Sequence, residues 1–226
     1  MSKPGHPDGG IEVAQDVGRY RDVEEFDDRA AGYETGWRGD LHHRIADRTA
    51  EIAMATAPGS QRILDVGCGT GYLLRKLAES YPDAVELAGI DPAPRMIAEA
   101  KAAAADFHRL AFTTGVAERL PFAAGTFDLI LSSTSFDHWA DQRAGVAELA
   151  RVMAPGGHLV ITDLFSGLLL PTLLGSHRGR ARTVGKASAL LREAGFASLR
   201  WHNLSGVLTF AGVLVRTVTA TGAGHG

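Results

Sequence analysis

A short apolar segment that runs into three alternating glycines constrains the fold of this chain most. Residues 62–66 (RILDV) are typical of a buried strand, and Gly67, Gly69 and Gly71 follow before a helical pattern from Tyr72. Glycine lets the backbone turn sharply and leaves it bare, so a ligand can lie against it. The start of the following helix adds partial positive charge. This pattern predicts a ligand-binding loop after a strand, with a purely structural turn as the alternative.

Two familiar phosphate-binding loops do not fit this spacing. A dinucleotide-binding loop needs a third glycine at position 72, where the chain has Tyr72, and a Walker A loop needs Gly-Lys-Ser or Gly-Lys-Thr. Asp65, inside the loop motif, suits a cationic amine better than a pyrophosphate. Asp91 ends the next strand, 20 residues after Gly71, where a carboxylate can accept hydrogen bonds from ribose hydroxyls. A helix N-cap before Pro92 is the alternative for Asp91.

Strand and helix patterns alternate along the chain. Further strands are expected near residues 85–90, 111–114, 127–132, 158–162, 199–204 and 208–218, and helices near 72–81, 94–105, 143–153 and 186–194. Alternation predicts a doubly wound, mostly parallel sheet with helices on both faces. The last two strands have a short connection, which forces an antiparallel pair. The predicted fold class is therefore α/β and Rossmann-like, with seven strands and an antiparallel C-terminal hairpin strand.

Length, charge and cysteine content restrict the class of protein. The 226 residues suit one domain over 19–220, with an N-terminal helical cap at about 19–58 and disordered tails at 1–18 and 221–226. One cysteine makes neither an internal disulfide nor a structural zinc site, and no metal is expected. A formal net charge of −3 argues against nucleic-acid binding. We find no secretory signal or membrane-spanning segment, and expect a cytoplasmic monomer or homodimer that does not bind membranes.

Four motifs, in order, resemble one enzyme family. They are residues 65–71 (DVGCGTG), 89–96 (GIDPAPRM), 115–122 (GVAERLPF) with Phe127-Asp128, and 149–157 (LARVMAPGG). Together they resemble the class I S-adenosylmethionine-dependent methyltransferases, in particular the small-molecule branch of the ubiquinone/menaquinone type (methyltransferase type 11). The resemblance covers roughly residues 20–220. It implies S-adenosylmethionine as cofactor and S-adenosylhomocysteine as product, and leaves the acceptor open.

The resemblance also implies which residues contact the cofactor. The glycine loop would wrap the methionine part, Asp65 would hold its ammonium, and Asp91 would bind the ribose hydroxyls. Tyr33, in a segment that folds over the cofactor in this family, would touch the methionine carboxylate. The expected cofactor-binding residues are Tyr33, Asp65, Gly67, Cys68, Gly69, Gly71, Asp91, Pro92, Met96, Ala117, Glu118, Ser132 and Ser133.

Some of these implied contacts have a plain structural alternative. Met96 would pack against adenine, or belong to the core. Ala117 and Glu118 would meet the adenine edge, although Glu118 also suits a surface charge. Ser132 and Ser133, at the end of the fourth strand, would lie near the sulfonium and the amino group.

The acceptor side offers His138 as the catalytic residue. Positioning the nucleophile behind the methyl group carries much of the catalysis, and a base is needed only where the acceptor must lose a proton. Relatives often carry paired histidines after the fourth strand, whereas residues 136–139 (FDHW) contain only the second, His138. A structural histidine is the alternative. His42 and His43 lie on the N-terminal helix, where a solvated helix face is favoured over a substrate contact.

The connection over residues 164–182 begins apolar and turns basic. Its apolar part suggests an aromatic or lipid-like acceptor, and a core helix explains it equally well. The leading hypothesis is methylation of a small molecule on oxygen, nitrogen or carbon. The alternative is a protein of the same fold that binds the cofactor for a non-methylating reaction, such as a cyclase or isomerase, or for regulation. Tyr72 argues against a nicotinamide oxidoreductase.

Overall fold

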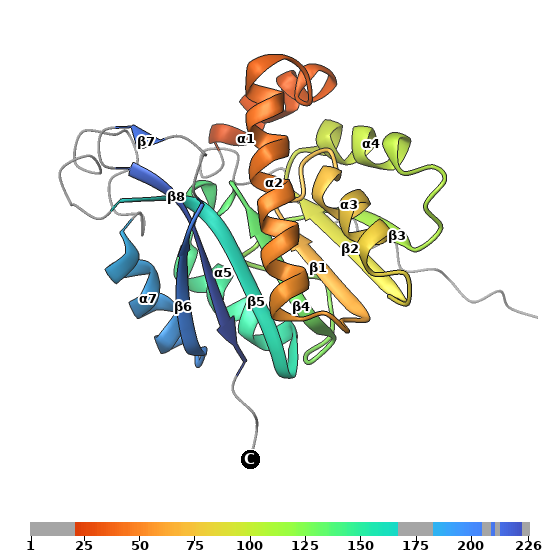
Figure 1. Ribbon diagram of the computed structural model, residues 1–226. Coiled ribbons are helices and arrows are strands. Elements are labelled where there is room, and N and C mark those ends of the chain that lie inside the picture. Colours follow the sequence, from red (N-terminus) through yellow and green to blue (C-terminus); the bar gives the residue numbers. More distant parts are fainter. Residues whose placement is uncertain (1–20, 167–182, 205–208, 211–212, 223–226) are drawn as a thin grey trace, which may run out of the picture.

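A mixed β-sheet runs through the centre of the molecule (Figure 1). The computed structural model describes residues 21–166, 183–204, 209–210 and 213–222. The main strands lie in the order β3-β2-β1-β4-β5-β8-β6, and the short β7 pairs with β8. The strands are β1 (Arg62–Val66), β2 (Glu86–Asp91), β3 (Leu110–Thr114), β4 (Phe127–Ser133), β5 (Met153–Ser166), β6 (Ala197–Asn203), β7 (Thr209–Phe210) and β8 (Val213–Thr221).

The helices are those that the sequence pattern predicts, with small shifts at their ends. They are α1 (Arg21–Arg29), α2 (Gly36–Thr56), α3 (Tyr72–Ser80), α4 (Pro94–Ala103), α5 (Gln142–Val152) and α7 (Val184–Glu193), with 3₁₀ turns η3 (Ala30–Gly32) and η4 (Phe136–His138). The tail predicted at 1–18 lies outside the described residues, as do 223–226 of the tail predicted at 221–226. Thr221 is the last residue of β8.

The sheet has the predicted topology. Strands β1 to β5 pair in parallel, whereas β8 runs antiparallel to both β5 and β6. The mostly parallel α/β fold with one antiparallel C-terminal strand is therefore confirmed. One difference concerns β5, which begins at Met153 rather than near residue 158, where the sequence pattern placed its start. Met153 pairs with Phe127 and His158 with Leu129, so residues 154–157 bulge out of register.

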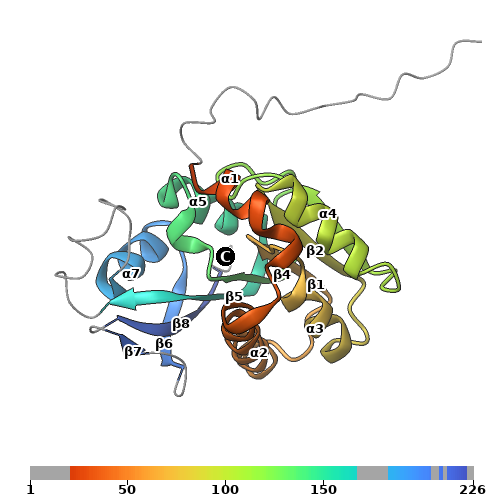
Figure 2. The same cartoon turned by 90° about the horizontal axis from the view of Figure 1, so that it is seen from above.

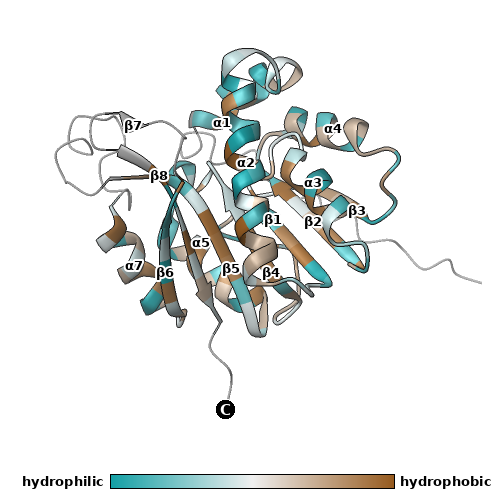
Figure 3. Cartoon of the chain, in the orientation of Figure 1, coloured by the Kyte–Doolittle hydropathy of each residue, from teal (hydrophilic) through white to brown (hydrophobic). Residues whose placement is uncertain are grey.

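Alternating side chains of the central strands enter two apolar layers. Leu64 and Val66 of β1 face residues of α5 and α7, and Ile63 faces residues of α2, α3 and α4. Successive strand residues point to opposite faces of a sheet, and a parallel strand covered on both faces reads as an apolar run. Figure 3 shows this as brown central strands, with more polar colours on α1 and the upper part of α2. Both of these elements lie near the strand ends.

A chain of buried hydroxyl groups fixes α2 to the sheet. Thr49 Oγ1 of α2 lies 2.9 Å from Thr162 Oγ1 of β5, which in turn lies 2.7 Å from Thr217 Oγ1 of β8. From this anchor toward its N-terminal end, α2 extends beyond the carboxyl ends of the parallel strands, which is upward in Figure 1. Seen from above, α1 and α2 lie on opposite sides of those ends (Figure 2). The sheet edge where a ligand is expected therefore lies between two N-terminal helices.

Candidate functional site

A pocket lies at the carboxyl ends of β1 and β4, between the glycine loop and α2. Its wall consists of Tyr33, Glu34, His42, His43, Ala46, Asp65, Gly67, Cys68, Gly69, Thr70, Tyr72, Leu73, Ser133 and Thr134. This is where ligands bind in open α/β sheets. The pocket encloses about 60 Å³, whereas pockets for small ligands usually have ~300 Å³ or more. The N-terminal segment thus lies close over the site.

The glycine loop has a backbone that other residues adopt only with strain. The φ angles of Gly67, Gly69 and Gly71 are +78°, +51° and +76°. A Cβ atom on Gly67 would lie 1.8 Å from Ser135 Oγ, and one on Gly71 would lie 2.8 Å from the Phe112 ring. These two glycines are required by packing as well as by conformation.

Gly69 differs because the pocket leaves space for a Cβ atom at this position. A Cβ atom there would meet no atom closer than Tyr33 Cε1, at 3.9 Å. The Gly69 N–H points the other way and donates to Asp91 Oδ2 at 2.9 Å. The loop therefore presents bare backbone to the pocket at this residue.

Asp91 supports the loop from behind and is not part of the pocket wall. Its Oδ1 accepts from the Ala93 N–H at 2.9 Å, and its Oδ2 from Gly69. Burial raises the pKa of the Asp91 carboxyl to about 6, although the two hydrogen bonds act in the opposite direction. Each carboxylate oxygen retains a second acceptor position. Asp91 thus ties the end of β2 to the residue before α4 without capping that helix, whose N-cap is Ala93 and has no side-chain cap. Its carboxylate keeps the capacity to bind hydroxyl groups.

Asp65 is a buried carboxyl group that faces the pocket. The residue is 2% exposed, and Asp65 Oδ1 has no hydrogen-bond partner among the described residues. Burial, and then the negative charge of Asp91, raise the pKa of the Asp65 carboxyl to about 8. An unpaired buried carboxylate is costly, and an adjacent cation would favour its charged form. The site is therefore suited to a ligand that carries a positive charge.

Tyr33 covers this part of the pocket. It packs beside Ala30, Ala93 and Met96, and its ring stacks on His42 with a centroid distance of 5.0 Å. Burial, and then the charge of Asp91, raise the pKa of Tyr33 to about 12. The phenol group therefore remains protonated at neutral pH and can donate a hydrogen bond to a ligand.

A group of polar residues, the Glu34 cluster (Glu34, His43, Thr70 and Arg75), holds the N-terminal segment on the glycine loop. Glu34 Oε1 accepts from Thr70 Oγ1 at 2.6 Å and from Arg75 Nη2 at 2.9 Å, and His43 Nε2 lies 3.4 Å from Glu34 Oε2. Burial raises the pKa of Glu34, but the hydrogen bonds from Thr70 and Arg75 outweigh it, so the pKa is lowered. Glu34 is therefore charged and bonded at neutral pH.

A glycine on α2 allows this close approach. A Cβ atom on Gly39 would lie 2.3 Å from the Glu34 carbonyl carbon. The turn before α2 therefore packs directly on the helix backbone, which directs Glu34 toward the glycine loop.

His42 is the second histidine of the pocket wall. Its Nδ1 lies 3.5 Å from Thr134 Oγ1, directly after β4. Thr134 has a φ of +54°, a left-handed conformation that is uncommon for a β-branched residue and is often found at functional sites. Burial, and then the positive charge of Arg29, lower the pKa of His42. The neutral imidazole is therefore favoured.

His138, the predicted base, has different surroundings. Its Nδ1 lies 2.9 Å from Asp22 Oδ2 of α1, and its Nε2 lies 3.2 Å from Asp137 Oδ1. The ring also makes an edge contact with Phe26 at a centroid distance of 5.0 Å. His138 is not part of the pocket wall. In this arrangement it connects α1 to η4 at the end of β4.

The structure brings some of the predicted cofactor-binding residues together and separates others. The pocket wall includes Tyr33, Asp65, Gly67, Cys68, Gly69 and Ser133. Behind the wall lie Gly71, Asp91, half-buried Pro92, buried Met96, and Ser132, whose Oγ is 3.4 Å from Ser135 Oγ. Burial raises the pKa of the Cys68 thiol, which fits a small wall residue rather than a nucleophile.

Ala117 and Glu118 lie away from this pocket. Ala117 is buried in the layer that contains α5 residues, and Glu118 Oε1 accepts from the Asp141 N–H at 2.9 Å, just before α5. No contact with the pocket is seen for either of them.

Sequence reasoning did not select Glu34, Thr70, Tyr72 or Thr134, and it favoured a solvated face for His42 and His43. A signal existed for His42, because residues 42, 46, 49 and 53 follow the helical spacing of a buried face, and Ala46, Thr49 and Ala53 are buried. Among the described residues there is no group of three or more side chains suited to hold a metal ion. The same residues contain no helix long and apolar enough to cross a membrane.

Comparison with known proteins identifies the family. The family model "Methyltransferase domain" matches residues 63–157. The demethylmenaquinone methyltransferase of Beutenbergia cavernae is 32% identical over 191 residues, which cover 72% of this chain and 76% of that protein. The chain belongs to the class I S-adenosylmethionine-dependent methyltransferases of the ubiquinone/menaquinone type.

Two further comparisons define how far this similarity extends. The demethylmenaquinone methyltransferase of Deinococcus radiodurans is 37% identical over 134 residues, which cover 58% of this chain but only about half (51%) of that relative. The crystal structure of the cyclase SpnF has the same fold, with a TM-score of 0.68 at 22% identity over 80% of this chain and 81% of that one.

The site fits S-adenosylmethionine, the cofactor of this methyltransferase family. Asp65 Oδ1, a buried acceptor without a partner among the described residues, faces the pocket and suits a cationic group. Gly69 leaves bare backbone beside it. At Gly69, therefore, no side chain of the loop obstructs a ligand that carries an ammonium group.

Proposed function

We propose that this chain transfers the methyl group of S-adenosylmethionine to a small-molecule acceptor, at oxygen, nitrogen or carbon. The observation that carries the proposal is the buried Asp65 carboxyl, which lines the same pocket as Gly69 and has an oxygen without a partner among the described residues. Membership of the methyltransferase family supports the reaction class. When bound, the cofactor supplies an electrophilic methyl group.

The cofactor-binding roles that the family resemblance implies are part of this proposal. Asp65 would pair with the ammonium group, and the glycine loop would wrap the methionine part. Asp91 would bind the ribose hydroxyls with its remaining acceptor positions, beside Met96, and Tyr33 would donate to the carboxylate. Tyr33 and Glu34 are part of the pocket wall, so the N-terminal segment would lie over the bound cofactor.

We propose an acceptor with an apolar, ring-like part. Trp37 at the start of α2 is 69% exposed, and Leu164 near the end of β5 is 45% exposed. Both belong to elements that border the carboxyl ends of the strands, although neither is part of the pocket wall, and sites for small molecules are lined mostly by apolar side chains. The demethylmenaquinone named for the relatives is consistent with this class. Residues 167–182, also considered for the acceptor pocket, lie outside the described residues.

The alternative is a protein that binds the cofactor without methylating an acceptor. A cyclase has the same fold, which is consistent with this alternative. Our proposal further includes a cytoplasmic protein, monomeric or homodimeric, without nucleic-acid or membrane partners and without a metal.

Isothermal titration with S-adenosylmethionine and S-adenosylhomocysteine tests the proposal first. We expect one site for each ligand per chain, and the absence of both would overturn the proposal. Incubation with hydroquinones, phenols and amines should then give S-adenosylhomocysteine and methylated product in a ratio of one to one. Binding together with an acceptor converted without S-adenosylhomocysteine would favour the non-methylating alternative.

A further inference from the structure

We propose that His42, on α2, is the general base that takes the proton of the acceptor. This inference rests on the proposed function and adds to it the proton-accepting residue and an acceptor class: a hydroxyl group that must lose its proton as it is methylated. The argument depends on where α2 places the ring, which groups surround it, and how these differ from the surroundings of His138.

The first argument is position. His42 precedes Thr49 by two helical turns, about 10.5 Å along the helix, and Thr49 is anchored to Thr162 of β5. Strand residues alternate between faces, so Leu164 lies on the same face of β5 as Thr162, nearer the end of the strand. The ring of His42 therefore lies over the strand ends, beside Thr134 and on the sheet face of exposed Leu164.

The second argument is orientation. Stacking on Tyr33 sets the plane of the His42 ring, at an interplanar angle of 30°. The contact of Nδ1 with Thr134 Oγ1 occupies one ring nitrogen. When Nδ1–H donates to Thr134, the lone pair of the imidazole is on Nε2, which is the atom that accepts a proton.

The third argument is charge. Burial lowers the pKa of His42, and so do positive charges on α1 (Arg29), on α2 itself (His43 and Arg38) and on η4 (His138). Tyr33, the remaining titratable group against the ring, is protonated at neutral pH because its own pKa is raised. A base must be neutral before it accepts a proton, and these surroundings keep His42 in that form.

The contrast with His138 completes the argument. Both ring nitrogens of His138 face carboxylates, Asp22 and Asp137, and the residue is absent from the pocket wall. Its contacts are those of a residue that holds α1 in place.

The proposed step balances as follows. The acceptor oxygen forms a bond to the methyl carbon while the carbon–sulfur bond breaks, and the electron pair of that bond goes to sulfur. The acceptor proton passes to His42 Nε2 and leaves for solvent after the product has gone.

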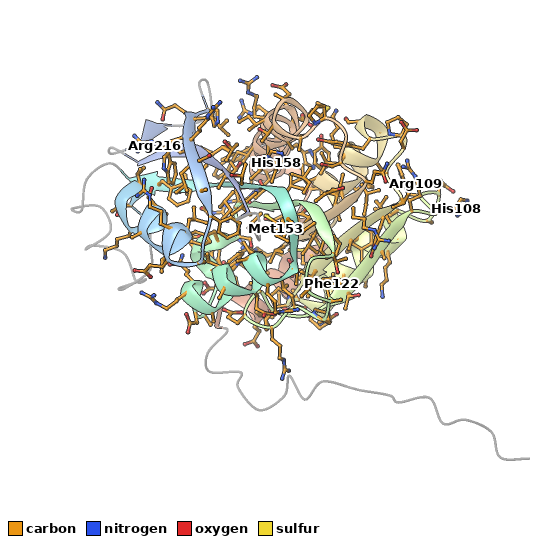
Figure 4. All side chains as sticks on the ribbon, turned by 90° about the horizontal axis from the view of Figure 1, so that it is seen from below. His108, Arg109, Phe122, Met153, His158 and Arg216 are labelled. Atoms are coloured by element: carbon orange, nitrogen blue, oxygen red, sulfur yellow. The ribbon has the colours of Figure 1, made fainter. Side chains whose placement is uncertain are left out.

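The test compares His42→Asn and His138→Asn with His108→Asn, a control at an exposed site on the lower face of the molecule (Figure 4). Two acceptor probes are used at about pH 8: 1-naphthol, which is still protonated there, and 4-nitrophenol, which is largely ionised there. We expect His42→Asn to lower the rate with 1-naphthol about 100-fold, a usual contribution of a general base, and to change the rate with 4-nitrophenol far less. Equal loss with both probes, or no loss, would overturn the role of His42.

A second readout needs no turnover. In the ternary complex with S-adenosylhomocysteine, the absorbance of 1-naphthol reports its ionisation, which should occur at lower pH with the unaltered protein than with His42→Asn. The same ionisation midpoint in both would contradict the proposal. A selective loss with His138→Asn alone would assign the base to His138. If the unaltered protein fails to bind S-adenosylhomocysteine, the proposed function itself is wrong, which is a different outcome from failure of the His42 comparison.

Discussion

The two sides of the pocket are built in different ways. On the cofactor side, the end of β1 and the glycine loop contribute Asp65, Gly67 and Gly69 from one short segment of chain. On the acceptor side that we propose, His42 meets Thr134, which lies 92 residues further along the sequence. The first side depends on backbone conformation and local spacing. The second depends on where the fold places a helix, so it is less constrained by any single motif.

The largest expected effect is a loss of affinity for S-adenosylhomocysteine when the cofactor side is changed. Asp65→Asn removes the charge that would pair with an ammonium group, and we expect affinity for S-adenosylhomocysteine to fall about 100-fold, or about 2.8 kcal/mol. Isothermal titration measures this. Asp128→Asn is the matched control, because Asp128 bonds the Gln61 and Arg62 amides at the start of β1, far from the pocket. Equal affinity in the Asp65 variant and the unaltered protein would refute the assignment.

A smaller loss of affinity is expected at Gly69, where bare backbone faces the pocket. Gly69→Ala adds a methyl group in front of Tyr33 and keeps a φ of +51°, which costs about 1 kcal/mol for an alanine. We predict that affinity for S-adenosylhomocysteine falls about tenfold, since 1.4 kcal/mol corresponds to tenfold. Gly59→Ala, where a Cβ meets nothing within 4 Å and φ is not positive, should leave the affinity unchanged. If both variants bind alike, Gly69 does not face the ligand.

Between the two sides, the Glu34 cluster should control how fast the pocket opens. Glu34→Gln weakens the charged hydrogen bonds with Thr70 and Arg75, and such bonds contribute more than neutral ones. We expect release of S-adenosylhomocysteine to become about fivefold faster in stopped-flow measurements, because about 1 kcal/mol of closed-state stability is lost. Glu148→Gln removes a comparable pair with Arg151 outside the pocket and should leave release unchanged. Slower release would contradict the prediction.

The last comparison concerns the dependence of stability on pH. The pKa of Asp65 is about 8 in the folded protein against an ordinary value of 3.8, so its contribution to stability is present below about pH 4 and is lost as pH rises to about 8. The side chain introduced by Asp65→Asn cannot ionise. In the absence of cofactor, its melting temperature relative to the unaltered protein should therefore increase between pH 5 and pH 8. Parallel pH dependence in the two proteins would show that Asp65 does not titrate in this way.

The sequence by itself determined the sheet topology and the cofactor side. The strand at Arg62–Val66 has the predicted bounds, and the positive φ angles of the three loop glycines agree with their role in a sharp turn. These features were predictable because conformation at glycine and the burial of a central strand are local properties of the chain.

The acceptor side that we propose depends on the tertiary structure. The sequence pointed to His138 and favoured a solvated face for His42, whereas the fold places His138 between two carboxylates and His42 in the pocket wall. Likewise, Glu118 turns to the Asp141 amide rather than to this pocket. The physical reason is that these side chains take their partners from elements far away in sequence, and the positions of those elements follow from packing, as when buried Thr49 anchors α2 to β5.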